Sequence, residues 1–429
     1  MKIDLSQFIG KCECGKTHGM DIRKILLEPG ALEQVPQVIS ELGLSGKAAI
    51  ICDRNTWNAA GKRVSRLLPE HHIIMIERDS IHPDERLVAD IENMLPSDID
   101  SIGYIVGVGG GVITDTAKYI GKHHGGIPVV LIPTAASVDG FAANSSIMTF
   151  NNFKHPLTTQ SAAAIIADTN VLCAAPYRLT ASGLGDLLGK YIALADWKIA
   201  SLVTGEAVCP RIYGMVDEAL MRAVKVIDKV KENDPDAIEA LMYALILSGL
   251  TIQMWGNSRP ASGAEHMLAH VWELALFSPD TGFLHGETVG VGTVICKKLY
   301  EKLIEAVGER PREFFVPYKG FPHESLREKL GEIVYAELMP YNNPDEGTMV
   351  DYEKLIASWG EICRICADMP DSAEMERIFR DLGVKSTLED LGISADILPV
   401  TLEVGSFVRG RMTLFRIWER FSNIGIDLR

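Results

Sequence analysis

Short apolar runs of strand length alternate with helical patterns through residues 22 to 130, and this alternation restricts the possible folds more than any other feature. The runs IRKILLE, AAIICD, HHIIMIE, SIGYIVGV and IPVVLIP are of strand length, and most are rich in β-branched residues. Each is followed by a turn signal or an amphipathic stretch, which is typical of βαβ units that build a parallel sheet. We therefore expect an α/β domain with a parallel sheet at the start of the chain.

The character of the chain changes near residue 178. AAAIIADTNVL predicts one more strand, and from Thr180 onward helical periodicity replaces the strand signals. Further helices are expected to begin near Tyr352, Ala373 and Val408. A length of 429 residues suits two or three domains. The sequence thus predicts an α/β domain over residues 1–178, followed by an all-α domain over residues 179–429.

A glycine-rich segment follows the fourth strand-like run. The segment Gly107-Val108-Gly109-Gly110-Gly111 stands at its end, and VITDTAKYIGKH then reads as a helix. Glycines let backbone amides approach a pyrophosphate, and a helix N-terminus adds unpaired N–H groups and a partial positive charge. The pattern departs from G-x-G-x-x-G because Val112 stands where the third glycine would be. As a generic dinucleotide fingerprint it is therefore weak.

Two acidic residues near predicted strand ends are candidates for ligand contacts. Asp53 ends AAIICD and could accept hydrogen bonds from an adenosine ribose, which would favour NAD over NADP. A helix N-cap is the alternative role for Asp53. The loop TAASVDGFAANSS after IPVVLIP contains Ser137, Asp139 and Asn144 among small residues that can pack against a flat ligand. Asp139 could accept from a hydroxyl, although Asp139-Gly140 also suits a plain turn.

A histidine-rich stretch runs from residue 257 to 292. His266 and His270 are four residues apart, so on a helix they share one face, and His285 follows in a glycine-flanked segment. Imidazoles suit divalent transition metals, and Asp186, a lone carboxylate in ASGLGDLLGKY, is the candidate for a further ligand. Each histidine alone would more often be a hydrogen-bonded core or surface residue. Three further charged residues crowd the stretch, namely Arg259, Glu265 and Glu287.

Composition excludes some classes of partner. The net charge of -15 argues against nonspecific nucleic-acid binding, which needs a basic surface. The first residues contain no apolar core of the kind that a secretory signal needs, so a cytoplasmic protein is expected. The stretch from Ala240 to Ser258 is uncharged, but its polar residues favour a buried core helix over a membrane span.

The eight cysteines are expected to be reduced in such a chain. Cys12-x-Cys14 with His18 resembles half a zinc knuckle, but no second ligand pair follows at knuckle spacing. Cys363-x-x-Cys366 lies in a helical pattern where both can be packing residues. The sequence leaves the role of the first cluster open.

Four motifs together resemble a known family. GVGGGVITDTAK fits the GGGxxxDxxK pattern of the superfamily of iron-type alcohol dehydrogenases, glycerol dehydrogenases and dehydroquinate synthases. Within it, TAASVDGFAANSS, GNSRPASGAEHMLAH and LHGETVGVG are similar to the sn-glycerol-1-phosphate dehydrogenases of archaea and of bacterial arabinose operons. The resemblance covers about Ile22 to Gly292. It implies a dehydroquinate synthase-like fold, with a dinucleotide-binding domain followed by a helical domain that binds metal and substrate.

The resemblance also implies an activity, which is the reversible reduction of dihydroxyacetone phosphate to sn-glycerol 1-phosphate with NADH or NADPH. The implied metal ligands are Asp186, His266 and His285, which with His270 make up the expected catalytic set. The implied substrate contacts are Asp139, Asp186 and His270, and the implied nucleotide contacts are Asp53, Gly109, Gly110, Gly111, Thr114, Asp115, Thr134 and Ser137. One departure is Ala143, where the family often has serine, so a cofactor hydrogen bond is missing or moved to Asn144.

This residue set is consistent with one mechanism. Two imidazoles and a carboxylate leave a divalent metal with open positions, where it can polarise a carbonyl as a Lewis acid. His270 could orient a hydroxyl or relay a proton. Arg259 is our candidate for the substrate phosphate, because a guanidinium matches phosphate oxygens bidentately. The metal could be zinc, nickel or iron, a homo-oligomer is expected from the family, and the sequence does not say whether the product feeds phospholipid biosynthesis.

Three alternatives stay open at this point. The first is a glycerol or other polyol dehydrogenase with the same metal and nucleotide, against which the SRPASGAEH run argues. The second is a carbon–oxygen lyase of the dehydroquinate synthase kind, which is expected to have more Lys and Arg near Asp139. The third is a sugar-phosphate sensor or scaffold that has lost catalysis, which the complete set of Asp186, His266 and His285 disfavours.

Overall fold

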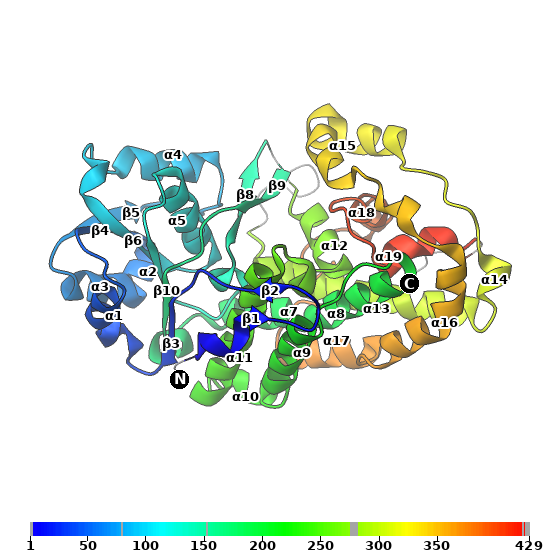
Figure 1. The fold of residues 1–429 in the computed structure, drawn as a ribbon, viewed down its shortest axis with the longest axis horizontal. Coiled ribbons are helices and arrows are strands. Elements are labelled where there is room, and N and C mark those ends of the chain that lie inside the picture. Colours follow the sequence, from blue (N-terminus) through cyan, green and yellow to red (C-terminus); the bar gives the residue numbers. More distant parts are fainter. Residues whose placement is uncertain (1–2, 79, 152, 275–281, 423, 425–429) are drawn as a thin grey trace. The chain divides into compact units, whose positions relative to one another are not determined.

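The structure is a computed structural model that describes residues 3–78, 80–151, 153–274, 282–422 and 424. The chain divides into two compact units (Figure 1). Unit 1 comprises residues 1–150, 154–187 and 214–258, and unit 2 comprises residues 151–153, 188–213 and 259–429. This division does not follow the expected boundary at residue 178, which falls inside helix α7 (Tyr177–Leu188). Residues 214–258 belong to unit 1 because helix α11 (Pro235–Trp255) packs against the strands and loops of that unit.

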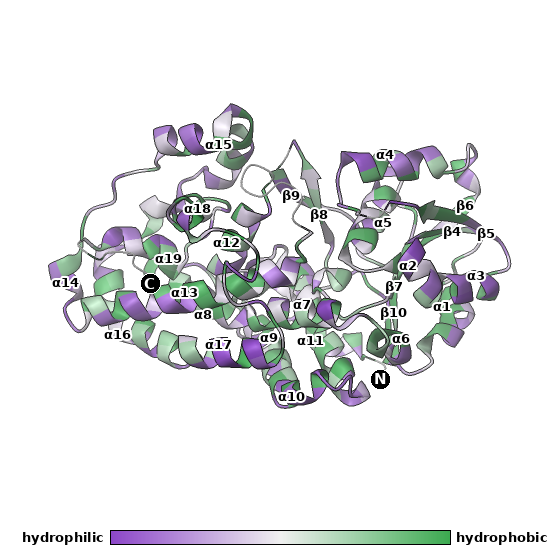
Figure 2. Ribbon diagram, turned by 180° about the vertical axis from the view of Figure 1, so that it is seen from behind, coloured by the Kyte–Doolittle hydropathy of each residue, from purple (hydrophilic) through white to green (hydrophobic). Residues whose placement is uncertain are grey.

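Unit 1 is built on a six-stranded parallel sheet with the strand order β3-β10-β7-β6-β4-β5. The strands are β3 (Lys24–Glu28), β4 (Lys47–Asp53), β5 (His71–Ile76), β6 (Ile102–Gly109), β7 (Val129–Pro133) and β10 (Ala164–Asp168). All six were predicted from apolar runs, so the expected α/β class with a parallel sheet is confirmed. Figure 2 shows β4 and β6 as hydrophobic, as expected for strands that are covered on both faces.

The helices of unit 1 follow the strands in chain order. They are α1 (Val35–Glu41), α2 (Arg54–Thr56), α3 (Lys62–Leu67), α4 (Glu85–Met94), α5 (Gly111–His123), α6 (Thr169–Cys173), α7, α9 (Pro210–Val224), α10 (Ile227–Val230) and α11, of which α7 and α9 continue across the division between the units. One face of the sheet packs on α1 and α3 through residues such as Val38, Val64 and Ile50.

Two antiparallel hairpins were not predicted. The first pairs β1 (Gly10–Lys11) with β2 (Thr17–His18), and the second pairs β8 (Ser145–Phe150) with β9 (Phe153–Thr158). Their strands are short or carry polar residues, so they lack the continuous apolar run that marks the strands of the central sheet.

Helix α11 is the segment that was weighed as a membrane span. By length and composition it is apolar enough to cross a membrane, and 89% of its most apolar window is buried inside the structure. Burial of this extent is typical of a core helix, in agreement with the interpretation from sequence.

Unit 2 is mostly helical. Its helices are α8 (Lys190–Thr204), α12 (Ala264–Trp272), α13 (His285–Val307), α14 (Pro311–Phe314), α15 (His323–Leu338), α16 (Tyr352–Ala367), α17 (Ser372–Asp381), α18 (Leu398–Gly405) and α19 (Leu414–Ile417). Helices α16 and α17 begin where the sequence predicted, but the helix expected from near Val408 is wrong. The chain turns there, and a side chain at Gly410 would lie 1.9 Å from the carbonyl oxygen of Tyr341. This close approach of two backbone segments is a tertiary constraint that helical periodicity does not reveal.

Candidate active site

In unit 1, the predicted nucleotide residues gather at the carboxyl edge of the sheet. Strands β4 and β6 are neighbours, with Ile51 opposite Gly107. Asp53 and Gly109 each lie two residues further on, so both stand at the ends of adjacent parallel strands. The chain runs from β4 outward to β5 and then returns past β4 to β6. The crevice between β4 and β6 is therefore a topological switch point, where open α/β sheets bind their ligands.

The glycine segment joins β6 to α5 tightly. A Cβ at Gly109 would lie 2.8 Å from Cβ of Ile113, and one at Gly111 would lie 3.1 Å from Cγ2 of Val138. Gly110 is the N-cap of α5 and, in the described structure, no side chain caps this helix end. The first-turn amides of α5 therefore face the switch point without a capping side chain, which suits an anionic phosphate.

Thr114 and Asp115 support the first turns of α5. The buried hydroxyl of Thr114 donates to the carbonyl of Gly111 at 3.1 Å. The Asp115 carboxylate forms an ion pair with Lys118 at 2.9 Å and accepts from the backbone N–H of Ile147 at 3.0 Å. Both residues thus have structural partners around the glycine segment, and a direct contact with a nucleotide stays a prediction.

Asp53 is the N-cap of helix α2, which is the alternative role that the sequence indicated for it. Its carboxylate accepts from the backbone N–H of Thr56 at 2.9 Å, and the Thr56 hydroxyl accepts from the N–H of Asp53 at 3.0 Å. This reciprocal capping box starts α2. The cap uses the Oδ1 atom of Asp53 and holds the side chain at the edge of the sheet, where a ribose contact stays a prediction.

The loop after β7 lies against the glycine segment and α7. The N–H of Thr134 donates to the carbonyl of Gly109 at 3.3 Å, and Thr134 and Ser137 are both buried. A Cβ at Gly183 of α7 would lie only 1.9 Å from the carbonyl oxygen of Ala136. Helix α7 therefore touches this loop through Gly183, one turn before Asp186.

The same loop brings Asp139 and Asp186 together in unit 1. The backbone N–H of Asp139 donates to Oδ2 of Asp186 at 2.9 Å. The Ser248 hydroxyl of α11 donates to Oδ2 of Asp139 at 2.8 Å. A Cβ at Gly249 would lie 2.3 Å from the carbonyl oxygen of Asp139, so α11 also approaches the loop closely. Two helices thus fix the positions of both carboxylates.

In unit 2, the three predicted histidines form one cluster. His266 and His270 lie on α12, and His285 is the first residue of α13. The ring centroids of His266 and His285 are 5.2 Å apart, and those of His270 and His285 are 5.8 Å apart. The packing of α12 against α13 therefore brings residues 19 positions apart in the chain into one group.

Carboxylates hold the Nδ1 atoms of these histidines. Glu265, which is buried, lies 2.6 Å from Nδ1 of His266. The Glu273 side chain, which is 6% exposed, lies 3.0 Å from Nδ1 of His285 and 3.3 Å from Nδ1 of His270. A carboxylate at Nδ1 fixes ring orientation and leaves Nε2 as the ligating atom, which is the usual environment of a metal-binding histidine.

His270 is neutral in these surroundings. Burial lowers its pKa to about 3, and the Glu273 carboxylate opposes this shift only in part. A neutral ring that donates its Nδ1 proton to Glu273 has Nε2 as a hydrogen-bond acceptor. This atom can accept a hydrogen bond from a substrate hydroxyl.

Arg259 is buried and has structural partners. Its Nε and Nη2 donate to the Glu206 carboxylate at 2.9 and 3.2 Å. Nη2 also donates to the carbonyls of Asp196 and Met412 at 3.0 and 2.8 Å. A phosphate that bound to Nε and Nη2 of Arg259 would have to displace Glu206. A phosphate-binding role for Arg259 therefore stays a prediction. Glu287 caps α13 by accepting from the N–H of Leu284 at 3.0 Å.

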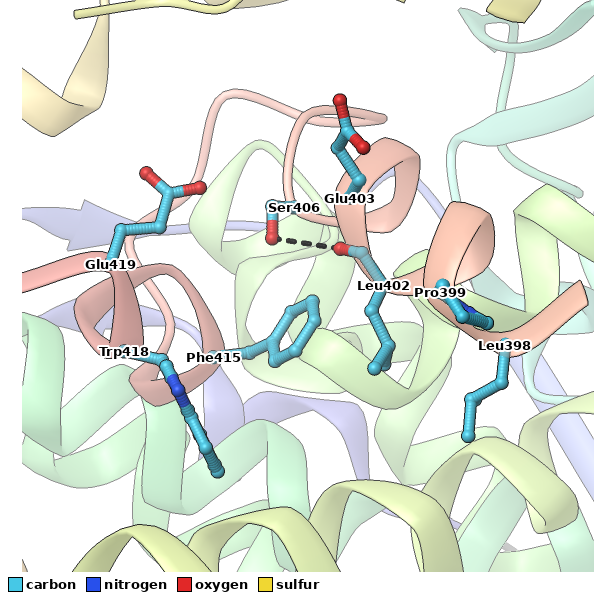
Figure 3. Close-up of a pocket in the computed structure, with 8 residues that line it drawn as sticks. All are labelled: Leu398, Pro399, Leu402, Glu403, Ser406, Phe415, Trp418 and Glu419. Atoms are coloured by element: carbon cyan, nitrogen blue, oxygen red, sulfur yellow. Dashed lines mark hydrogen bonds between the residues drawn. The ribbon is translucent and has the colours of Figure 1, made fainter. Parts of the chain in front are cut away.

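A separate pocket of about 350 Å³ lies in unit 2 (Figure 3). It is lined by Leu398, Pro399, Leu402, Glu403, Ser406, Phe415, Trp418 and Glu419. Burial raises the pKa of Glu419 to about 7. None of the residues that sequence analysis singled out lines this pocket.

Sequence analysis missed the residues that hold the predicted ones in place. Glu273, Gly183 and Ser248 contact candidate site residues, yet none of them belongs to a motif. The available signals were weak. Glu273 is three residues after His270, which suits a contact on one helical face, and Ser248-Gly249 interrupts an apolar helix.

Comparison with known proteins identifies a family and several relatives of this chain. The family of iron-containing alcohol dehydrogenases matches residues 26–176. A glycerol-1-phosphate dehydrogenase (NAD(P)+) of Halalkalibacterium halodurans is 34% identical over 94% of both chains. One from Bacillus licheniformis is 35% identical over 70% of this chain and 75% of its own. Among solved structures, a probable glycerol dehydrogenase from Sinorhizobium meliloti has a similar fold, with a TM-score of 0.59, 18% identity and coverage of 90% and 89% of the two chains.

Proposed function

The chain belongs to the family of glycerol-1-phosphate dehydrogenases, and from this we propose that it interconverts dihydroxyacetone phosphate and sn-glycerol 1-phosphate. The reaction is a hydride transfer between NADH or NADPH and C2 of the substrate, with a proton added to the oxygen during reduction. The observation that carries the proposal within this family is the histidine cluster. The rings of His266 and His285 lie together, and a carboxylate is placed at Nδ1 of each.

The nucleotide site in this proposal is the switch point between β4 and β6. The pyrophosphate would lie on the glycines 109–111 and the first-turn amides of α5. Thr114, Asp115, Thr134 and Ser137 surround that segment and would shape the site. Asp53 would accept hydrogen bonds from the adenosine ribose, which favours NADH, since a 2′-phosphate there would meet a negative charge.

The metal ligands in this proposal are Asp186, His266 and His285. Each of these residues offers one ligand atom, and the donor set of one carboxylate and two imidazoles suits zinc or nickel. A divalent metal held by these residues would supply a Lewis acid for the C2 carbonyl. Glu265 and Glu273 keep the two rings oriented for this task.

Asp139 and His270 are the proposed substrate contacts. Oδ2 of Asp139 accepts from Ser248, so the carboxylate is held in place while it accepts from a substrate hydroxyl. Nε2 of His270 would accept from another hydroxyl. Arg259 is the proposed phosphate residue, and Arg259→Ala then raises KM for dihydroxyacetone phosphate far more than for dihydroxyacetone. If Arg259 serves only to pair with Glu206, the variant loses thermal stability and the two KM values change equally.

The decisive experiment is NADH oxidation with dihydroxyacetone phosphate by protein that has been stripped with a chelator and refilled with zinc or nickel. We expect metal-dependent turnover and a product of the sn-glycerol 1-phosphate configuration. His285→Ala should abolish turnover, whereas His82→Ala, at an exposed position of unit 1, should retain it. Turnover of glycerol but not of the phosphorylated substrate would assign a polyol dehydrogenase. Product formation from a heptulosonate phosphate without net NADH change would assign a lyase.

The cellular setting is part of the same proposal. The protein works in the cytoplasm on a small phosphorylated substrate, as a homo-oligomer. Light scattering coupled to size-exclusion chromatography measures the oligomer, and a mass of 47.0 kDa, that of one chain, would contradict it.

A further inference from the structure

The N-terminal hairpin of unit 1 carries two cysteines and a histidine that the dehydrogenase reaction does not use. Strands β1 and β2 pair with Gly10 opposite His18. In the turn, the N–H of Cys12 donates to the carbonyl of Lys16 at 2.9 Å, and the N–H of Gly15 donates to the carbonyl of Cys12 at 3.0 Å. Gly15 has a φ of +83°, which lets the chain turn sharply between the cysteines and the histidine. The turn thus places all three side chains on one short hairpin.

Cys14 and His18 are as close as two ligands of one metal ion. Their Sγ and Nε2 atoms are 3.3 Å apart. Zinc ligands at about 2.3 Å (sulfur) and 2.0–2.1 Å (nitrogen) in a tetrahedron would be about 3.6 Å apart. A thiol–imidazole hydrogen bond has a similar length, so this distance alone does not choose between the two arrangements.

The orientation of His18 favours a metal. The ring is 1% exposed, and its Nδ1 lies 3.0 Å from the carbonyl oxygen of Met254, at the end of α11. A carbonyl oxygen can only accept, so Nδ1 carries the proton and Nε2, the atom near Cys14, presents a lone pair. A backbone carbonyl on one ring nitrogen is the usual partner of a metal-ligating histidine. Lys16 also lies 3.7 Å from the ring centroid of Trp255, so the hairpin is anchored to the same end of α11.

Cys12 and Cys14 are partly exposed thiols at the turn of the hairpin. All eight cysteines are thiols and not disulfides in the part of the chain that the structure describes.

We propose that Cys12, Cys14 and His18 of this hairpin bind a zinc ion. Each residue offers one ligand atom, and two thiolates with one imidazole are ligands that zinc prefers. None of the three is among the proposed ligands of the catalytic metal, so this zinc has a structural role and does not take part in hydride transfer. It closes the turn of the N-terminal hairpin, and the Met254 carbonyl supports its histidine ligand.

Cobalt substitution tests the site without relying on dehydrogenase activity. The proposed catalytic ligands include no cysteine, so a thiolate-to-cobalt charge-transfer band in the near ultraviolet reports on the new site alone. We expect this band in the otherwise native protein and also in His285→Ala. Absence of the band from the cobalt-loaded native protein would overturn the proposal, whether or not the protein reduces dihydroxyacetone phosphate.

Variants then assign the ligands. Cys12→Ser and Cys14→Ser should each reduce the zinc content measured by mass spectrometry and weaken the cobalt band. Cys173→Ser, at a partly exposed thiol of α6, is the matched control and should change neither. A Cys14→Ser protein with undiminished zinc and an unchanged band would remove Cys14 from the ligand set and overturn the proposed site. If Cys14→Ser does not fold, release of zinc from the native protein by a mercurial that titrates thiols gives the same information.

Discussion

Replacing Gly183 by alanine should test how α7 positions the candidate catalytic carboxylate. The added Cβ would lie 1.9 Å from the carbonyl oxygen of Ala136 and 2.8 Å from its carbonyl carbon. These are backbone atoms, so no side-chain rotation can relieve the clash. A normal carbon–oxygen contact is about 3.3 Å or longer, so α7 and the loop must separate locally by about 1.4 Å.

This displacement should affect both stability and catalysis. Overpacking of this kind costs about 1–3 kcal/mol, and each kcal/mol lowers Tm by about 2–4 °C for a unit of this size. Asp186 follows Gly183 by three residues and accepts a 2.9 Å hydrogen bond from the backbone N–H of Asp139, so the shift moves the Asp186 carboxylate away from the loop. A misplacement of about 1 Å at a catalytic group can reduce turnover by on the order of a hundredfold.

The assay compares Gly183→Ala with Gly214→Ala by thermal denaturation and by kcat/KM for dihydroxyacetone phosphate. Gly214 lies within helix α9, and a Cβ there meets nothing within 4 Å. Alanine should therefore be neutral or stabilising at this position, by up to about 1 kcal/mol from helix propensity. The reasoning fails if Gly183→Ala matches the control in both Tm and kcat/KM, because α7 would then tolerate the side chain without moving.

Three further predictions concern single carboxylates. Glu273→Gln should weaken metal binding by about 10–100-fold in a chelator competition, since Glu273 orients two histidine rings, and unchanged affinity would contradict this role. Asp53→Ala should lower stability by about 1 kcal/mol through loss of the cap and should also raise the Kd for NADH in a fluorescence titration; loss of stability alone would leave Asp53 as a cap only. Burial raises the pKa of Asp196 from 3.8 to about 6, so the folded chain binds this proton more tightly than the unfolded chain. Its contribution to stability should fall by about 3 kcal/mol as the pH rises from about 4 to about 6, and Asp196→Asn should remove that part of the Tm–pH profile; an unchanged profile would contradict it.

The amino-acid sequence by itself determined the strands of the sheet and which residues are candidates for the site. A strand covered on both faces requires a continuous apolar run, so β4, β6 and β7 could be read directly from their β-branched residues. The spacing of His266 and His270 determined that both lie on one face of a helix. The glycines after β6 indicated a close approach of backbone, and the structure has Gly109 against Ile113. These signals are local, because each depends on residues within about two turns or one strand.

Tertiary structure alone decided which groups hold those residues in place. Nothing near His285 in sequence indicates that Glu273 would orient it, because the contact depends on the packing of α12 against α13. Gly183 looked like an ordinary small residue until the carbonyl of Ala136 was found against it. The segment near Val408 is another example of a contact that the sequence does not indicate. The helix expected there is replaced by a turn that brings Gly410 against Tyr341. Hydrophobic periodicity indicates which face of a helix or strand is buried. Close contacts between segments that are distant in sequence depend on how whole helices and strands pack.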